Sequence, residues 1–210
     1  MTADLRRPDA VAAVVLAAGR STRMGAENKL LLEIEPGVPV IRRTVELALD
    51  CSLDTVFVVT GHEAEHVCRA LEGLPCRFVH NPDYANGLSG SVRAGFRQAV
   101  GEGASGVLVM LGDMPSLPKE AIAAVLEAAV ADPDRAVQAT HAGKPAHPIW
   151  LPARLVILAD RLEGDRGLRG LIAESDEPML DVEVEVAATD DIDTPQDFAR
   201  ALERSSAARG

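Results

Sequence analysis

The sequence of 210 residues has few aromatic side chains, few cysteines and no long apolar run. One Trp, one Tyr and four Phe make up 3% of the residues, so a core must be built mainly from Val, Leu, Ile and Ala. Cys51, Cys68 and Cys76 fit neither a pairing scheme nor a CxxC motif, which favours a reducing, cytoplasmic setting. No stretch reaches the roughly 18 apolar residues of a membrane span, so we expect no membrane association.

The chain also has fewer basic than acidic residues. The chain has 21 Lys and Arg against 32 Asp and Glu, which gives a formal net charge of −11. Such a surface repels DNA and RNA, and no basic patch interrupts it, so nucleic acid is not an expected partner. The hydrophobic share of 47% and the charged share of 25% are typical of a folded globular chain, and the length fits a single domain, 1–210.

Apolar runs alternate with helical patterns along the first two thirds of the chain. Unbroken apolar runs, typical of buried parallel strands, lie at 10–18, 55–61, 76–81 and 106–113. Helical patterns lie between and after them, at 39–50, 63–73, 90–100 and 118–131. This alternation predicts an α/β fold with a central, mostly parallel sheet flanked by helices.

The last third of the chain is less regular. We predict one or two strands within 135–151 and a half-exposed edge strand at 179–186, where apolar and acidic residues alternate. A closing helix is predicted at 194–205, with Thr194 as its N-cap, and the two ends of the chain read as short loose tails.

Two motif matches do not fit their surroundings. HEAEH at 62–66 matches the zinc-protease pattern H-E-x-x-H, but a strand that ends at Gly61 places His62 before the helix. GEGASG at 101–106 matches G-x-G-x-x-G, but it follows a helix and precedes a strand, the reverse of a dinucleotide-binding turn. Zinc hydrolysis and NAD(P)-dependent oxidoreduction are therefore disfavoured.

A glycine-rich loop that carries two candidate phosphate-binding cations follows the first strand. LAAGRSTRMGAENKLL (16–31) turns at Gly19, at the carboxyl edge of the predicted sheet where open α/β folds bind ligands. Free amides together with Arg23 and Lys29 suit a triphosphate, because the amides donate hydrogen bonds to its oxygens and the cations offset its charge. The alternative is a surface turn with solvated bases.

Carboxylates occur at two further places. Asp113 ends the apolar run VLVMLGD, where a lone carboxylate needs a partner such as Mg²⁺ that is also bound by substrate phosphates. Helix capping is the alternative, although Ser116 is better placed for it. Asp190, Asp191 and Asp193 crowd before the closing helix, and Asp191 or Asp193 is a candidate for a second metal ligand.

Taken together, these segments resemble the family of molybdenum cofactor nucleotidyltransferases. The resemblance spans nearly the whole chain, from VVLAAGRSTRMGAENKLLL through VVTGH, VHNPDYANGLSGSVRAG and GDMP to AHPIWL, GDRGLRGLI and DIDTPQDF. It implies a Rossmann-like nucleotidyltransferase fold, with a nucleotide-binding half at about 10–115 and an acceptor half at about 116–205. The motif LAAG at 16–19 differs from the guanylyl branch, which looks like LAGG there. GDMP also resembles the cytidylyl branch more than the guanylyl one, so the resemblance favours CTP.

The resemblance also implies nucleotide-site roles. Backbone atoms at four positions would contact the base and ribose: Leu16, Ala17, Ala18 and Gly19. The base-recognition segment would include Asn81, Gly87 and Ser91. The catalytic residues would be Arg23 and Lys29, which hold the triphosphate, and Asp113, which binds Mg²⁺ with Asp191 or Asp193.

For the acceptor, the resemblance implies that His147 and the segment GDRG, with Asp165, bind the pterin. Ala146 and Leu168 depart from the residues that family members often carry there. The expected reaction is a Mg²⁺-dependent transfer of CMP from CTP to the terminal phosphate of molybdopterin, with release of pyrophosphate. A molybdoenzyme that receives the product is a further expected partner. The alternatives are a nucleotidyltransferase of the same fold that uses GTP or a sugar or alcohol phosphate, and a non-catalytic chaperone for the cofactor.

Overall fold

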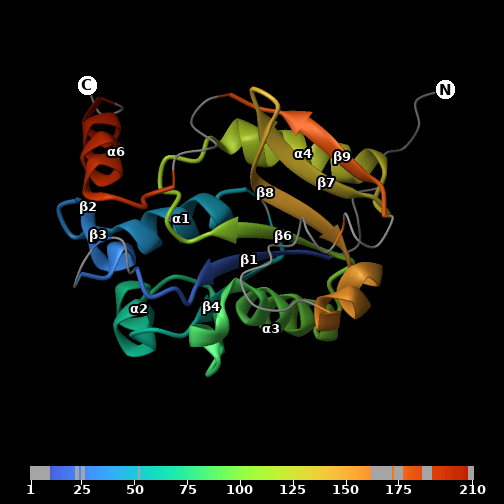
Figure 1. The fold of residues 1–210 in the computed structure, drawn as a ribbon, viewed down its shortest axis with the longest axis horizontal. Helices are drawn as coiled ribbons and strands as arrows, with labels where there is room; N and C mark the ends of the chain where they lie inside the picture. The colour runs from blue at the N-terminus through green and yellow to red at the C-terminus, as the bar shows by residue number, and fades with distance from the viewer. Residues whose placement is uncertain are drawn as a thin grey trace.

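The computed structural model describes residues 10–21, 24, 27–51, 53–161, 172, 177–185 and 191–207. Within these residues a seven-stranded sheet, in the order β5-β4-β1-β6-β8-β7-β9, runs through the middle of the molecule (Figure 1). Its strands are β1 (Val11–Ala17), β4 (Thr55–Thr60), β5 (Arg77–His80), β6 (Gly106–Leu111), β7 (Ala136–His141), β8 (Lys144–Pro152) and β9 (Met179–Glu183). A separate two-stranded sheet is formed by β2 (Glu33–Glu35) and β3 (Val38–Pro39).

The sheet is mostly parallel, which confirms the predicted fold class. β1 pairs in parallel with β4 and β6, β4 with β5, and β7 with β9. The exception is β8, which is antiparallel to both β6 and β7. A two-residue turn at Ala142 and Gly143 joins β7 to β8, and so short a connection permits only antiparallel neighbours. β9 lies at the edge of the sheet, as its alternating sequence predicts.

Helices cover both faces of the sheet (Figure 1). Side chains of α1 (Val40–Leu49), α2 (Ala64–Ala70) and α4 (Lys119–Ala131) pack on one face. Side chains of α3 (Leu88–Gly101) and the 3₁₀ helix η4 (Ala153–Arg161) pack on the other. Two short 3₁₀ helices, η2 (Lys29–Leu31) and η3 (Tyr84–Asn86), lie in the connections after β1 and β5.

The closing helix, α6 (Pro195–Ala207), lies beside the small β2–β3 sheet (Figure 1). One buried hydrophobic cluster contains Ile34 of β2, Ile192 from the segment before α6, and Ala201 of α6. The end of the chain is therefore packed against its first third. None of the helices in the described part of the chain is both long and apolar enough to cross a membrane.

Small residues bring helices and rings close to the strands. A Cβ at Gly95 of α3 would overlap the side chains of Val14 and Val59, so this glycine lets the helix lie against the sheet. A Cβ at Gly106 would overlap the ring of Trp150, which is fully buried. The core has few bulky aromatic side chains, and it is densely packed because glycines let a helix and a ring lie close to the strands.

Three local predictions can be compared with the structure. α2 begins at Ala64, so His62 precedes the helix and the zinc-protease geometry is not formed. The GEGASG motif runs from the last residue of α3 to the first of β6, and its residues 102–105 connect the two, as predicted for a polar turn. The preference for Ser116 as the cap of the fourth predicted helix was wrong: α4 begins at Lys119, its N-cap is Pro118, and no side chain caps it.

Candidate active site

A cavity of about 370 Å³ opens at the carboxyl ends of β1 and β6. Its walls come from the loop after β1, from η3 and the start of α3, from the end of β6, and from the segment before α6. These segments are far apart in the sequence. They meet at the edge of the sheet where parallel strands end, which is the ligand-binding edge of open α/β folds.

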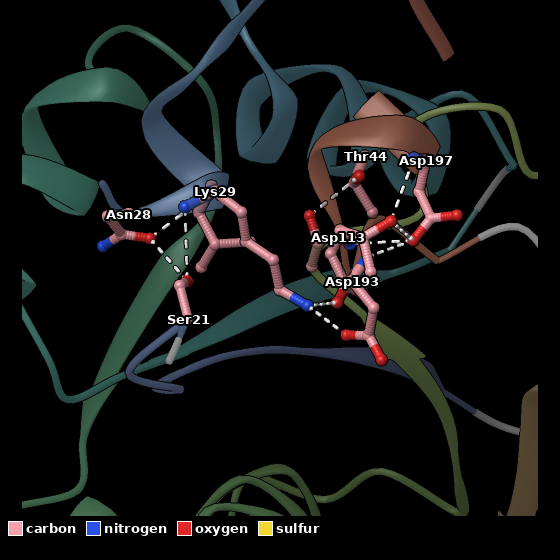
Figure 2. Close-up of polar contacts among 10 residues, drawn as sticks. Ser21, Asn28, Lys29, Thr44, Asp113, Asp193 and Asp197 are labelled. Atoms are coloured by element: carbon pink, nitrogen blue, oxygen red, sulfur yellow. Dashed lines mark hydrogen bonds and ion pairs between the residues drawn. The ribbon is translucent and has the colours of Figure 1, made fainter. Parts of the chain in front are cut away.

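Lys29 lies between two carboxylates in this cavity (Figure 2). Its Nζ is 2.5 Å from Oδ2 of Asp113 and 2.9 Å from Oδ1 of Asp193. Burial alone would lower the pKa of Lys29, but the charges and hydrogen bonds of Asp113 and then Asp193 outweigh it and raise the pKa above its usual value. Lys29 is therefore a fixed cation in a largely enclosed site.

The main chain of Lys29 is tied to the start of the same loop. The Lys29 N–H donates to Oγ of Ser21 at 3.2 Å, and Oδ1 of Asn28 accepts from the Leu30 N–H at 3.1 Å and from the Ser21 hydroxyl at 3.3 Å (Figure 2). Asn28 thus caps η2 and joins both ends of the loop. Hydrogen bonds within the loop therefore position the main chain of Lys29. Its side chain is held by Asp113 and Asp193, which are distant in the sequence.

The main chain around Asp113 is held from three directions. The Gly112 N–H donates to the Leu16 carbonyl at 2.9 Å, and the Thr44 hydroxyl donates to the Gly112 carbonyl at 3.0 Å. The Ile192 N–H donates to the Asp113 carbonyl at 3.1 Å. β1, α1 and the segment before α6 therefore all fix the peptide units on either side of this carboxylate.

Asp193 is placed by the start of α6. The carboxylate of Asp197 accepts from the N–H groups of Asp193, at 3.2 Å, and Thr194, at 2.7 Å (Figure 2). The Thr194 hydroxyl in turn accepts from the Asp197 N–H at 3.3 Å. This reciprocal pair is a capping box with Asp at its third helical position, and it confirms Thr194 as the N-cap.

The carboxylates suit a metal that is shared with a substrate. Oδ1 of Asp113 is buried and has no hydrogen-bond partner in the described part of the chain. The pKa of Asp191 is raised, first by its burial and then by the negative charges of Asp113 and Asp193. Asp191 is therefore close enough to these two carboxylates to be affected by their charge. Among the described residues, no three His, Cys, Asp or Glu side chains come together as a ready metal cage. One or two carboxylates completed by phosphate oxygens are what Mg²⁺ accepts.

The cavity brings together many of the residues predicted from the sequence, namely Leu16, Ala18, Gly19, Lys29, Gly87, Ser91, Asp113 and Asp193. Ala17 is buried on the opposite face of β1, in the cluster that includes α1. Asp191 lines a much smaller hollow beside α6. Arg23 and Asp165 lie outside the described residues.

Asn81 lies behind the cavity wall and does not line it. Its Nδ2 donates to Oγ of Ser91 at 3.0 Å, and its Oδ1 accepts from the Asp83 N–H at 3.1 Å. Gly87, which precedes α3, has a φ of 107°, a conformation that glycine adopts without strain. Asn81 and Gly87 together shape the turn from β5 into α3.

His147, predicted to bind the acceptor, is on β8 and is not among the residues that line the cavity. Its Nδ1 is 3.4 Å from the Val109 carbonyl. Burial lowers the pKa of His147, although the Val109 carbonyl and the charge of Asp113 act in the opposite direction. The imidazole is therefore neutral at pH 7.

Tyr84 is a cavity residue that the sequence reasoning missed. It packs over Gly61, where a Cβ would lie 2.5 Å from the Tyr84 Cβ and 2.9 Å from the Ala18 Cβ. The neighbouring His62 N–H donates to the Ala18 carbonyl at 3.2 Å. A glycine directly after β4, at the same edge of the sheet as Gly19, was the available signal that something packs closely there. Outside the predicted loop at 16–31, the lining residues that were given no individual role were Ala85, Leu88 and Leu111, and the loop itself contributes four more: Arg20, Ser21, Met24 and Leu30.

Comparison with known proteins agrees with this geometry. Residues 13–179 match the model of the MobA-like NTP transferase domain. The chain is 30% identical to the molybdenum cofactor cytidylyltransferase of Escherichia coli K12, over 93% of this chain and 97% of that protein. It is also 30% identical to the purine catabolism protein PucB of Bacillus subtilis, over 88% and 92%.

Solved structures give the same result. A nucleotidyl transferase from Methanothermobacter, Mth528, superposes with a TM-score of 0.83 at 28% identity, covering 95% of this chain and 99% of that one. Rv0371c from Mycobacterium tuberculosis superposes with a TM-score of 0.78 at 27% identity, covering 93% and 99%. The family resemblance and the Rossmann-like nucleotidyltransferase fold are thereby confirmed, and the chain belongs to the MobA-like NTP transferase family, whose members are nucleotidyltransferase enzymes.

Proposed function

We propose that this nucleotidyltransferase moves CMP from CTP to the terminal phosphate of molybdopterin and releases pyrophosphate. The observation that carries the proposal is the meeting of Lys29 and Asp113, 2.5 Å apart, in a cavity of about 370 Å³ between the first loop and the start of α3. A cation and a candidate metal ligand side by side suit a triphosphate better than an uncharged ligand.

The choice of CTP has two supports. The E. coli relative that matches over most of both chains is a cytidylyltransferase. The Ala18 side chain, which stands where the guanylyl branch looks like glycine, lines the cavity and lies near Gly61. Its methyl group reduces the room for a base, which favours a pyrimidine over a purine.

The reaction needs charge control rather than a general base. A phosphate monoester oxygen of the acceptor attacks the α-phosphorus, and the bond from that phosphorus to the bridging oxygen of the β-phosphate breaks. The bonding electrons leave with pyrophosphate. The attacking oxygen is already anionic near pH 7, which fits a cavity whose described lining residues include no histidine.

The chain's own residues would reduce the repulsion between two anions. Lys29 would act as a point charge on the phosphates, and Arg23 would bind two oxygens with its planar guanidinium. Asp113, with Asp191 or Asp193, would hold Mg²⁺. When bound, the ion would neutralise charge that develops on the leaving group. Support for a divalent ion comes from Rv0371c, which has also been solved as a complex with manganese.

The acceptor side is proposed on the family likeness. We assign the nucleotide to the half at about 10–115 and the pterin to the half at about 116–205, with His147 and Asp165 as acceptor-binding residues. The neutral imidazole of His147 both donates and accepts hydrogen bonds, as a pterin ring requires. A molybdoenzyme would receive the product.

The test is incubation of the protein with each of the four NTPs, Mg²⁺ and molybdopterin, followed by mass measurement of the product. A CMP adduct with CTP alone is expected, and the Asp113→Asn variant should give none. A GMP adduct, or an adduct only with a sugar or alcohol phosphate, would contradict the substrate assignment. Nucleotide binding without pyrophosphate release would identify a cofactor chaperone instead.

A further inference from the structure

We infer that Lys29 is an internal counter-ion that keeps a free divalent metal away from Asp113 and Asp193, so that metal enters the site only together with a nucleotide. The inference rests on the proposed function for the nature of the site. It adds a condition on when the metal can bind. It also gives Lys29 a second role, on the carboxylates as well as on the phosphates.

The contacts of Lys29 are with the oxygens that a metal would need. Its ammonium lies 2.5 Å from Oδ2 of Asp113 and 2.9 Å from Oδ1 of Asp193. A divalent ion bound to the same two oxygens would lie against this ammonium, and the two cations would repel each other strongly in a partly buried site. The ammonium and the metal therefore compete for one position between the carboxylates.

Lys29 cannot easily leave this position for solvent. Its side chain is only 15% exposed, and its main chain is anchored to Ser21 and Asn28. Removing the ammonium from the two carboxylates would leave an uncompensated cation in a desolvated place unless another anion receives it. The cavity beside it has room for such an anion, and a triphosphate carries more negative charge than the two carboxylates together.

A metal–nucleotide complex meets both requirements at once. Its phosphates offer Lys29 a new partner, and its metal replaces the ammonium between the carboxylates. Free metal would replace the ammonium between the carboxylates but would bring no phosphate to pair with Lys29. The structure thus favours the metal–nucleotide complex as the species that binds, over a metal that waits in the site.

The chain offers a matched control for this idea. Lys119 pairs with Asp50 at 2.8 Å on the exposed surface, outside the cavity. Lys29→Met and Lys119→Met each remove one positive charge; the first leaves Asp113 and Asp193 without their lysine, and the second leaves Asp50 without its lysine. A general increase in affinity for cations, caused by the more negative net charge, would appear equally in both variants.

The experiment is a titration of the full-length protein with Mn²⁺ alone, without nucleotide or acceptor, in which electron paramagnetic resonance measures free Mn²⁺. We expect Lys29→Met to bind one Mn²⁺ at least about tenfold more tightly than wild type or Lys119→Met. Lys29→Arg, which keeps the cation, should bind as weakly as wild type. Adding Asp113→Asn to Lys29→Met should abolish the gain.

The inference is overturned if wild type and Lys29→Met bind Mn²⁺ equally, or if Lys119→Met gains as much as Lys29→Met. Thermal unfolding identifies any variant that does not fold, and Lys29→Gln then replaces Lys29→Met. Because the titration contains no nucleotide, it is independent of the product assay. A protein that uses CTP but gains no metal affinity would refute only this inference, whereas a gain in a protein that uses another nucleotide would refute only the substrate assignment.

Discussion

Thr44 on α1 holds the carbonyl group of Gly112 at the end of β6, with 3.0 Å between its hydroxyl oxygen and the carbonyl oxygen. Thr44 is fully buried, and Gly112 is the residue before Asp113. A Cβ at Gly112 would lie 2.8 Å from Cδ1 of Ile41 and 2.9 Å from the Leu16 carbonyl oxygen. The main chain that presents the carboxylate is thus packed on one side and hydrogen-bonded on another.

This bond gives a prediction for stability. Thr44→Val keeps the shape but removes the donor, so it should lower the free energy of unfolding by about 1–3 kcal/mol, the cost of leaving a buried carbonyl unpaired. Thr44→Ser should retain most of that stability. Urea unfolding of both variants measures the difference. A larger loss in Thr44→Ser than in Thr44→Val would show that packing by the methyl group, not the hydroxyl, is what matters.

Loss of the Asp113 carboxylate should stop the reaction without unfolding the protein. Asp113→Ala removes the buried oxygen that lacks a partner and one of the two contacts of Lys29. We expect no pyrophosphate release above background and a cooperative thermal transition. Near-normal turnover in the presence of Mg²⁺ would remove Asp113 from the metal role.

Loss of the Lys29 ammonium should weaken catalysis strongly. Lys29→Ala should lower kcat/KM by about two to three powers of ten, or about 3–4 kcal/mol of transition-state stabilisation. Steady-state pyrophosphate release measures it, with Lys119→Ala as a control for the change in charge. A loss of less than threefold would mean that Lys29 does not hold the phosphates.

An added methyl group at Gly61 should act on the nucleotide through Tyr84. The methyl group of Gly61→Ala would collide with the Cβ atoms of Tyr84 and Ala18, so Tyr84 must move from the cavity wall. We expect the KM for the nucleotide to rise more than kcat falls, because the wall and not the reacting atoms is displaced. Gly73→Ala would not serve as a control, because Gly73 has a φ of 84°. Gly101→Ala, where a Cβ meets no atom within 4 Å, is the matched variant.

The partly buried imidazole of His147 predicts a dependence of stability on pH. Burial lowers its pKa below the ordinary value of 6.5, so the unfolded chain binds a proton that the folded protein does not. The contribution to stability is therefore present above pH 6.5 and is lost as the pH falls below it. Urea unfolding at pH 7.5 and at about pH 5.5 should show a smaller loss for His147→Gln than for wild type. The same substitution at the exposed His80 should leave the loss unchanged.

Patterns along the chain were sufficient for the main sheet and its α-helices, but not for the small sheet of β2 and β3 or for the 3₁₀ helices. Apolar runs predict the strands, and the loop and the buried carboxylate predict the cavity's position. The direction of single side chains was harder to predict. Ala17 follows Leu16 on the strand, so it points to the other face, away from the cavity.

Contacts between distant segments could not be read from spacing. Asp191 and Asp193 are two residues apart, and spacing alone could not distinguish them as candidate metal ligands. In the structure it is Asp193 that lies beside Lys29, and Asp197 accepts hydrogen bonds from the N–H groups of Asp193 and Thr194. Tyr84 was missed for the same reason, because its neighbour Gly61 follows β4 whereas Tyr84 itself lies in η3, after β5.

Asp193 reaches Lys29 from a point near the end of the chain, 164 residues away. During synthesis, the first loop and the strand that carries Asp113 emerge long before the segment that completes the cluster. A ribosome-bound chain that stops short of α6 would carry the mouth of the cavity without one of its charged partners. The charge cluster is therefore complete only after the segment before α6 has been made, and a chain cut before residue 191 would lack Asp193 as a partner of Lys29.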